Sequence, residues 1–368
     1  MDDSFLKAKL DERCNAGNLR RLPETRKLQD FVSNDYLGLA GSKELFRRIH
    51  ERVGEEGPML NGGTGSRLLS GNHRFYAQLE EQLRDIFKAE SALAFNSGYA
   101  ANQALVASVA GKGDTIIYDQ LSHVCLKEGA WLSQAQTVVF RHNDLDDLKM
   151  KIQQATGRIF VVTETIFSMD GDIAPLKEII EICNDFGAFL IVDEAHSTGV
   201  AGPKGAGLLV EHDWHHEVFA RVYTFGKAMG VHGACVAGSQ RLKDFLVNFG
   251  RPFIYTTSLP PHSIISIEES FKFLADHIDL QLRLKEKVRS FRALFPDSSS
   301  ETAVQPIMIG SNEKARRVSD ELFKSGFDVR PILSPTVRRG TERLRVCLHV
   351  FNSENDVKSL ISCLNSLH

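Results

Sequence analysis

Two oppositely charged residues, each close to the end of an apolar run, are the strongest chemical signal in this sequence. Lys227 lies among small residues shortly after the run that ends at Thr224, and Asp193 directly follows the run 188–192. A lysine amine can form a Schiff base with pyridoxal phosphate (PLP), and a carboxylate can keep the pyridine nitrogen protonated, so that the ring accepts electrons. We therefore predict a PLP site built on Lys227 and Asp193. The alternatives are a buried salt bridge or two unrelated surface charges.

A Ser-Gly turn that opens a helix-like segment predicts where the cofactor phosphate binds. Ser97, Gly98 and Tyr99 join an apolar run to that segment. The first N–H groups of a helix and the positive end of its dipole attract an anion. Thr224, three residues before Lys227, can add a hydroxyl group to the same phosphate. An ordinary helix cap has the same pattern, so this prediction depends on the presence of Lys227 and Asp193.

Two histidines lie where an imidazole could contact the cofactor ring. His196 is three residues after Asp193, on the loop that leaves the expected strand, and can bond the phenolic oxygen. His123 follows the apolar run 115–118 and can stack on the open face of the ring. A lone histidine is more often structural, so both roles depend on Asp193.

Two further clusters receive no chemical role. The glycine-rich stretch 62–71 matches neither GxGxxG nor the P-loop spacing, and we interpret it as a loop in which backbones pack closely near the site. Residues 212–216 contain three histidines and an aspartate, but the group is local and polar and has no pattern that supplies a fourth ligand. We predict an exposed loop there and no metal site.

Composition and charge are those of an ordinary globular protein. Of the 368 residues, 42% are hydrophobic and 25% charged, and the net charge of −3 gives no reason to expect a nucleic-acid or membrane partner. The six cysteines have no metal-type spacing and are predicted to be reduced, mostly buried thiols. The acidic start has no secretory pattern and no apolar run is long enough to span a bilayer, so we expect a cytoplasmic protein.

Short β-rich runs alternate with helix-like segments through the middle of the chain. This alternation predicts an α/β fold with an open, largely parallel sheet and helices on both faces. In such a sheet the ligand lies at the carboxyl ends of the strands, just where Asp193 and His196 are expected. The expected strands are 115–118, 158–163, 188–192, 221–224 and 234–237, and the expected helices include 75–88 and one opened by Pro175.

The pattern changes after about residue 260, which predicts a second, smaller domain. A helical stretch over 263–294 is followed by a break and an α+β unit, so we divide the chain into an N-terminal segment 1–40, a large PLP-binding domain 41–262 and a small C-terminal domain 263–368. Within the last, residues 343–350 alternate strictly, which puts Arg343 and Arg345 on one strand face. Either arginine could hold a carboxylate with two hydrogen bonds.

Several ordered motifs from about residue 30 to the C-terminus resemble the α-oxoamine synthases. These are PLP enzymes of fold type I that join an amino acid to an acyl-CoA with loss of carbon dioxide. The motifs lie at Asn34–Gly38, Ser66–Gly71, Ser122–His123, Phe167–Gly171, Asp193–His196, Thr224–Lys227, Tyr255–Pro260 and Gly340–Arg345. The resemblance favours alanine and a pimeloyl thioester, of CoA or of a carrier protein, as substrates.

The resemblance also implies roles for individual residues. It implies Lys227 as the Schiff-base lysine, Asp193 on the pyridine nitrogen, and His123 stacked on the ring. It places His196 and Ser168 near the phenolic oxygen, and Asn34 and Arg345 on the carboxylate of the amino acid. Thr256 or Thr257 would reach the phosphate of the neighbouring subunit, which implies an obligate homodimer with shared active sites.

Departures from the family pattern are few, and alternatives within it remain open. The N-terminal segment is short, and Tyr76, the pair Val124-Cys125 and Ser197 replace the residues usual in relatives. Glycine or serine could replace alanine as substrate, and the same fold supports aminotransfer or β-elimination. A non-catalytic subunit of a heterodimer is a further alternative, but such a subunit would be expected to lack Lys227.

Overall fold

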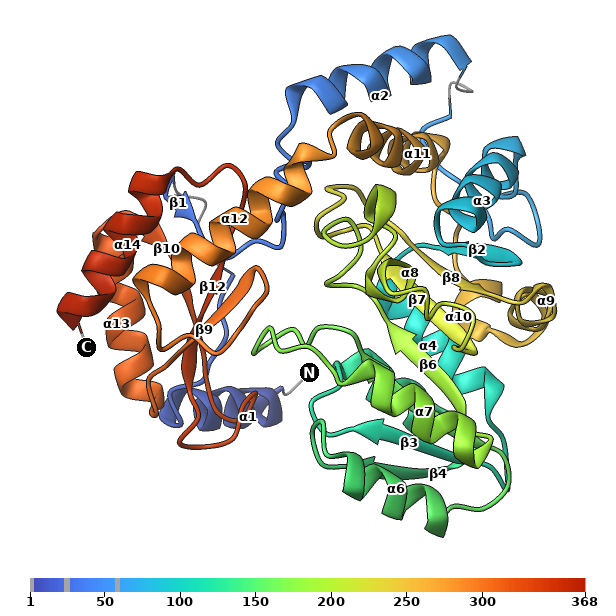
Figure 1. Cartoon of the computed structure of the whole chain (residues 1–368), viewed down its shortest axis with the longest axis horizontal. Coiled ribbons are helices and arrows are strands. Elements are labelled where there is room, and N and C mark those ends of the chain that lie inside the picture. The colour runs from blue at the N-terminus through green and yellow to red at the C-terminus, as the bar shows by residue number, and fades with distance from the viewer. Residues whose placement is uncertain (1–2, 23–26, 57–59, 368) are drawn as a thin grey trace. The chain divides into compact units, whose positions relative to one another are not determined.

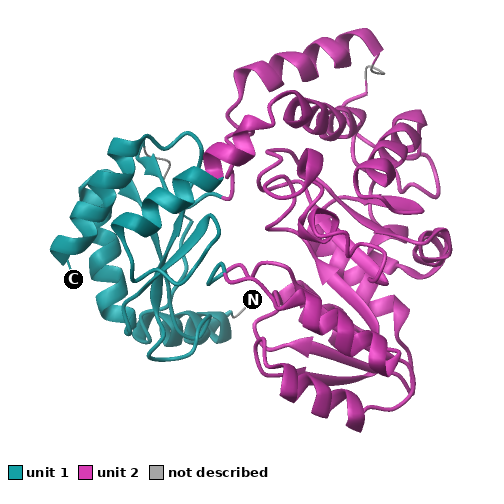
Figure 2. Cartoon of the chain, in the orientation of Figure 1, with its two compact units in different colours: residues 1–33, 169–171, 285–368 teal, residues 34–168, 172–284 magenta. Residues whose placement is uncertain are grey.

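The computed structural model describes residues 3–22, 27–56 and 60–367 and divides into two compact units (Figure 2). Residues 34–168 and 172–284 form the larger unit, and residues 1–33, 169–171 and 285–368 form the smaller one. The division predicted from the sequence, at residues 40 and 262, stays a prediction.

The larger unit is built on a mixed sheet that, among the described residues, has seven strands in the order β2-β8-β7-β6-β5-β3-β4 (Figure 1). β8 is antiparallel to both of its neighbours, and the other pairs are parallel. The predicted α/β class and largely parallel sheet are confirmed. The strands are β2 (Ser91–Phe95), β3 (Thr115–Asp119), β4 (Gln136–Phe140), β5 (Ile159–Glu164), β6 (Phe189–Asp193), β7 (Ala220–Thr224) and β8 (Ala234–Gly238).

Alternate residues of the central strands enter two separate cores, one on each face of the sheet. Ile116 on β3 and Ile191 on β6 pack with α4 (Gly98–Val109) and α5 (Val124–Leu132), whereas Ile117 and Leu190 on the same strands pack with α6 (Leu145–Gln154) and α7 (Leu176–Phe186). This is the two-residue period of a strand that is buried on both sides. The apolar runs of the sequence are continuous rather than alternating for this reason.

The helices of the larger unit follow the expected start and stop signals. Gly187 ends α7 in the left-handed conformation, with φ 65°. Glycine adopts this conformation at little energetic cost because it has no Cβ atom.

The helical stretch expected over 263–294 is two helices, α11 and α12. The backbone leaves helical geometry at His277, and a new helix starts at Asp279, whose acidic side chain is favourable at a helix N-terminus. The helices are α2 (Lys43–Glu56), α3 (Arg74–Ile86), α4 (Gly98–Val109), α5 (Val124–Leu132), α6 (Leu145–Gln154), α7 (Leu176–Phe186), the 3₁₀ turn η1 (Pro203–Gly205), α8 (Leu208–Glu211), α9 (Gln240–Phe249), α10 (Arg251–Ile254) and α11 (Pro261–Asp276). α12 (Asp279–Leu294) begins in the larger unit and continues into the smaller one.

The smaller unit contains an antiparallel sheet in the order β11-β12-β9 and a short parallel pair, β1 with β10. Leu344, Val346 and Leu348, which alternate along the stretch 343–350, enter its core, and the strand itself ends at Cys347. The elements are α1 (Ser4–Asn15), β1 (Gln29–Asp30), β9 (Val304–Met308), α13 (Asn312–Lys324), β10 (Phe327–Asp328), β11 (Arg330–Ile332), β12 (Arg343–Cys347) and α14 (Glu354–Leu367).

The predicted glycine-rich packing loop lies against the segment that follows α10. The Gly65 carbonyl accepts a hydrogen bond from the backbone of Ser258 at 2.9 Å. A Cβ atom on Gly63 or Gly71 would come within 2.2 Å of the Ser258 hydroxyl, so only glycine fits at either position. The hydroxyl of Tyr76 accepts from the next backbone group, Leu259 N, at 2.8 Å. The loop therefore positions the segment that contains Thr256 and Thr257.

A charged histidine bridges two aspartates beside the loop that carries Ser168. His142 contacts Asp119 at 2.9 Å through Nδ1 and Asp172 at 2.7 Å through Nε2. Burial alone would lower the pKa of His142, but the two carboxylates outweigh it and raise the pKa to about 9. The native state therefore favours an imidazolium at neutral pH.

This histidine predicts a loss of stability at alkaline pH. Because the folded-state pKa exceeds the unfolded value of 6.5, the stabilisation is complete below pH 6.5 and disappears as pH rises through about 9. We expect the free energy of unfolding to fall by on the order of 3 kcal/mol over that range. His142→Gln should remove most of this dependence in urea titrations at several pH values. An equal fall in wild type and variant would contradict the assignment.

Among the described residues, no helix is both long and apolar enough to cross a membrane. The six cysteines form no disulfide, and four of them, Cys125, Cys183, Cys235 and Cys347, are buried. The burial of these four agrees with the expectation of mostly buried thiols, and their reduced state stays a prediction.

Candidate active site

Three neighbouring strands of the larger unit end in polar residues at the same edge of the sheet. Glu164 ends β5, Asp193 ends β6 and Thr224 ends β7. In the strand register, Glu164 lies beside Asp193, and Asp193 lies beside Val222 of β7. The strands run parallel, so their carboxyl ends coincide, which is where α/β sheets bind ligands. Lys227 follows β7 by three residues and is partly buried.

Asp193 is held rigidly by two hydrogen-bond donors. Its Oδ1 accepts from the backbone N–H of Ala195 at 2.8 Å, and its Oδ2 accepts from Nδ2 of Asn102 on α4 at 2.6 Å. The residue is only 4% exposed. Hydrogen bonds to an ionised carboxylate are stronger than neutral ones. The arrangement therefore supports a fixed negative charge at the end of β6.

Mutual electrostatic effects place Lys227, Asp193, Glu164 and His123 in one site. Burial, with the charge of Asp193 second, raises the pKa of Glu164 to about 8, while Lys227 opposes that rise. Burial lowers the pKa of His123, and Lys227 lowers it further, whereas Asp193 acts in the opposite direction. The site therefore combines buried carboxyl groups, a lysine and an imidazole that favours its neutral form.

His123 caps the first turn of α5, and its backbone is anchored to β5. The backbone N–H of His123 donates to Oε1 of Glu164, and its side chain accepts from the backbone N–H of Cys125 at 3.3 Å. The ring is partly desolvated, while the residue as a whole keeps surface exposed to solvent. A partly exposed imidazole on an anchored backbone suits the stacking role that the sequence predicts, which stays a prediction.

His196 is connected to the segment around Asn34 through a tyrosine. The hydroxyl of Tyr36 lies 2.8 Å from Nδ1 of His196 and donates to Oδ1 of Asn34 at 3.1 Å. Tyr36 and His196 are 1% and 5% exposed, so this link is shielded from water. The structure thus brings together two predicted site residues that are far apart in the sequence.

Three of the predicted phosphate residues, Ser97, Gly98 and Thr224, meet at the start of α4, whereas the hydroxyl of Tyr99 donates to Glu128. Ser97 caps the helix by accepting from the backbone N–H of Ala100 at 3.2 Å. A Cβ atom on Gly98 would lie 2.1 Å from the hydroxyl oxygen of Thr224, so the bare backbone of Gly98 is what admits that hydroxyl. Asn96 donates from Nδ2 to the hydroxyl of Thr256 at 3.2 Å and to the Thr257 carbonyl at 2.6 Å.

These residues fit PLP at both of its polar ends. The glycine cradle and the Thr224 hydroxyl lie at a helix N-terminus, which suits a phosphate. The buried carboxylate of Asp193, with Lys227 one strand away, suits a protonated pyridine ring that bears an aldehyde. The two ends are joined through α4, since Asn102 of that helix binds Asp193.

Two further predicted residues, Ser168 and Arg345, belong to other segments of the chain. Ser168 lies in the turn after β5 and is partly buried. Arg345 lies on β12 of the smaller unit, where its Nη1 donates to Sγ of Cys347 at 3.0 Å. Arg343, on the same strand, forms an ion pair with Asp170. Their predicted roles stay predictions.

Sequence reasoning missed Glu164, Tyr36 and Asn102 as contacts of the site. Glu164 is a polar residue that ends an apolar run, the same signal that identified Asp193. Tyr36 lies inside the Asn34–Gly38 motif, although no role was assigned to it. Asn102 is a buried amide on an otherwise apolar helix. Such a residue needs a hydrogen-bond partner, and this requirement could have identified it.

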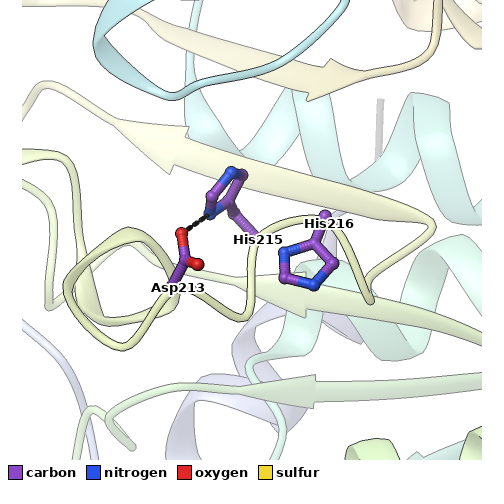
Figure 3. A group of neighbouring side chains, drawn as sticks. All are labelled: Asp213, His215 and His216. Carbon is purple, nitrogen blue, oxygen red and sulfur yellow. Dashed lines mark ion pairs between the residues drawn. The ribbon is translucent and has the colours of Figure 1, made fainter.

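The histidine-rich loop 212–216 forms a separate cluster (Figure 3). Asp213, His215 and His216 each offer a ligand atom within 4.8 Å of the others, and Nδ1 of His215 faces Asp213 Oδ1 at 3.6 Å. Asp213 and His216 are exposed. The three residues supply fewer ligands than a closed structural zinc site uses. The prediction that this chain holds no metal is untested.

Comparison with known proteins identifies the family. The model for aminotransferase class I and II matches residues 26–363. The chain is 39% identical over 345 residues to the 8-amino-7-oxononanoate synthase of Marinobacter nauticus, covering 92% of this chain and 87% of that protein. A solved structure of 8-amino-7-oxononanoate synthase from Francisella tularensis superposes with a TM-score of 0.78 at 27% identity, covering 92% of this chain and 97% of that one.

A solved variant of serine palmitoyltransferase from S. paucimobilis, with a bound PLP–myriocin aldimine, superposes with a TM-score of 0.88 at 26% identity. The match covers 98% of this chain and 96% of that one. The chain therefore belongs to the class I and II aminotransferase family of fold type I PLP enzymes. Within it, the chain is an acyl-transferring α-oxoamine synthase that uses PLP, an amino acid and an acyl thioester.

Proposed function

We propose that this enzyme condenses L-alanine with a pimeloyl thioester, of CoA or of a carrier protein, and releases 8-amino-7-oxononanoate, the free thiol and carbon dioxide. The observation that carries the proposal is the 39% identity, over most of both chains, to a protein named for that reaction. The buried Asp193, with Lys227 after the adjacent strand, supports the underlying chemistry.

We expect the chain's own residues to bind the cofactor and to transfer protons. Ser97, Gly98, Tyr99 and Thr224 bind the cofactor phosphate, and Asp193 holds a proton on the pyridine nitrogen. When bound, PLP supplies an electron sink for the electron pair released at Cα of the amino acid. Lys227 is the general base that removes the Cα proton and later returns a proton to the product.

The other residues would orient the substrate. Asn34 and Arg345 hold the carboxylate of the amino acid, so that Cα–H faces the lysine amine. His123 covers one face of the ring, and His196 and Ser168 hydrogen-bond its phenolic oxygen. The Tyr36 bond to both His196 and Asn34 supports a shared position for the ring contact and the carboxylate contact.

Glycine and serine are the alternative amino-acid substrates. The structural similarity to serine palmitoyltransferase is the reason to test serine. A free-thiol release assay should test alanine, glycine and serine against short, dicarboxylic and long acyl thioesters. The highest kcat/KM is expected for alanine with the pimeloyl thioester. A higher value for serine with a long-chain acyl-CoA would replace our proposal by the palmitoyltransferase alternative. One methylene changes pocket binding by only about 1–3 kcal/mol, so neighbouring chain lengths belong in the matrix.

Arg345→Ala should raise the KM for the amino acid by about ten- to a hundredfold, because a hydrogen bond to a charged group contributes about 1.5–3 kcal/mol. PLP occupancy, read from visible absorbance, should not change. Arg343→Ala is the matched control, since Arg343 is engaged with Asp170. That variant should lose stability rather than substrate affinity. If the KM rose in Arg343→Ala and not in Arg345→Ala, the two assignments would have to be exchanged.

We also propose a cytoplasmic homodimer in which Thr256 or Thr257 completes the phosphate site of the partner subunit. Two inactive variants, Lys227→Ala and the double variant Thr256→Ala/Thr257→Ala, should regain activity when co-expressed. A mixed dimer would then contain one intact site. As the control, the two variants are purified separately and then mixed under conditions in which the dimers do not exchange subunits. No recovery in isolated mixed dimers would show that these threonines serve their own subunit.

A further inference from the structure

Two buried side chains that the proposed reaction does not use lie between Asp193 and His123. Asn102 on α4 is 1% exposed and Cys125 on α5 is 2% exposed. Nδ2 of Asn102 donates to Asp193 Oδ2 at 2.6 Å and to Cys125 Sγ at 3.3 Å. Sγ of Cys125 in turn lies 2.9 Å from Nδ1 of His123. The four side chains thus form one continuous path.

The direction of every hydrogen bond in this path follows from one backbone group. The N–H of Cys125 points at Nδ1 of His123 at 3.3 Å, and a backbone N–H is always a donor. Nδ1 therefore carries no proton, and the neutral ring is protonated on Nε2. The thiol is left as the donor to Nδ1, while its sulfur accepts from Asn102. The amide of Asn102 has two protons and uses one on each neighbour.

We propose that Asn102 and Cys125 are positioning residues that join Asp193 and His123 into one network, and that the network holds the His123 ring in its Nε2-protonated form. The inference rests on the proposed function only for the roles of Asp193 and His123. The contacts themselves do not depend on the substrate.

Electrostatics agree with this arrangement. Burial, followed by the charge of Asp193, raises the pKa of the Cys125 thiol to about 12, so the sulfur keeps the proton that it donates. Burial lowers the pKa of His123, and the positive charge of Lys227 acts in the same direction. Lys127 also lowers it, whereas Asp193 opposes the shift. A thiol that donates to Nδ1 further favours the neutral ring, because protonation at Nδ1 would break that bond.

The test is a ¹⁵N NMR titration of histidine-labelled protein without PLP, with the His123 signals assigned through His123→Asn. Cys125→Ala should raise the His123 pKa by about 0.5 to 1, the equivalent of one neutral hydrogen bond. Cys125→Ser keeps a donor and should titrate like the wild type. Cys183→Ala is the matched control, since Cys183 is also a buried thiol with its pKa raised to about 12, but packs in the core on the other face of the sheet.

A second arm tests whether the path is continuous. Asn102→Ala should shift the His123 titration in the wild-type background and should have no further effect when Cys125 is already alanine. An unchanged His123 titration in folded Cys125→Ala protein would overturn the proposal. A shift of the His123 titration by Asn102→Ala that is equally large in the wild-type and Cys125→Ala backgrounds would also overturn it. Because these measurements use neither cofactor nor substrate, an inactive substrate matrix would contradict the proposed function and leave this inference standing.

Discussion

Lys227→Ala should eliminate measurable turnover while the protein still binds PLP. The amine is the proposed covalent anchor and the proposed general base, and a general base alone contributes about 10²- to 10⁴-fold to a rate. The phosphate cradle at the start of α4 does not involve Lys227, so cofactor binding should persist in weakened form. The measurements are the steady-state rate of thiol release and the cofactor content after gel filtration.

The identity of the anchoring lysine can be tested separately. Borohydride treatment of the PLP-loaded wild type should attach the cofactor to the peptide that contains Lys227. Lys127 is the matched control, because it lies on α5, burial lowers its pKa, and its amine donates to the Gln120 carbonyl at 2.7 Å. Lys127→Ala should therefore label like the wild type. Label on any other lysine would remove the central assignment.

Asp193→Asn should lower kcat/KM by at least about a hundredfold. The carboxylate balances the positive charge of a protonated pyridine in a buried position. Removing one partner of a buried charge pair typically costs about 3–5 kcal/mol, and each 1.36 kcal/mol is a factor of ten in rate. A well-folded Asp193→Asn protein with wild-type activity would exclude this role for the carboxylate.

The local structure of Asp193→Asn should change little. Oδ1 can still accept from the Ala195 backbone, but the new amide faces Nδ2 of Asn102, where two donors would meet at 2.6 Å. Rotation of the Asn102 side-chain amide, which exchanges the positions of its oxygen and nitrogen, can remove this clash between two donors. Its Oδ1 is free to accept, because it is buried and has no hydrogen-bond partner among the described residues. We therefore expect a small decrease in melting temperature beside a large loss of activity.

Asp114→Asn provides the opposite control. Asp114 is a buried acid just before β3, at the other end of the sheet, where hydrogen bonds from Arg158 lower its pKa to about 2. This stabilisation is present above the unfolded value of 3.8 and is lost as pH falls toward 2. The variant should melt earlier than the wild type at neutral pH and keep its turnover. Comparing the two variants separates catalytic effects from effects on folding.

Most of the site could be predicted because its principal residues follow short local patterns. An apolar run that ends in a polar residue predicts a strand with a functional carboxyl end, and this signal found Asp193 directly. A Ser-Gly turn before a helix predicted the cradle in which Gly98 now lies against Thr224. Both patterns depend on the geometry of a few consecutive residues, which the sequence specifies by itself.

The connections between these residues were decided by the tertiary structure. Tyr36 and His196 are 160 residues apart, and Asn102 and Asp193 are 91 residues apart, so no local period reports their contacts. The long helical pattern after residue 260 likewise did not show where α11 ends and α12 begins, because no glycine or proline marks the break at His277.

The sequence by itself therefore determined the α/β class, and it predicted the edge of the sheet at which the site is expected, with the lysine and carboxylate assigned to the cofactor. The tertiary structure alone decided which buried groups lie beside this lysine and carboxylate, and how neighbours such as Glu164 and His123 titrate. Glu164 illustrates the difference: its raised pKa comes from complete burial beside Asp193, and burial depends on how distant elements pack. The pattern of apolar and polar residues that predicts strands and helices is a short-range property of the sequence. The desolvation and charge interactions that shift pKa values act between residues that only the packed interior brings together.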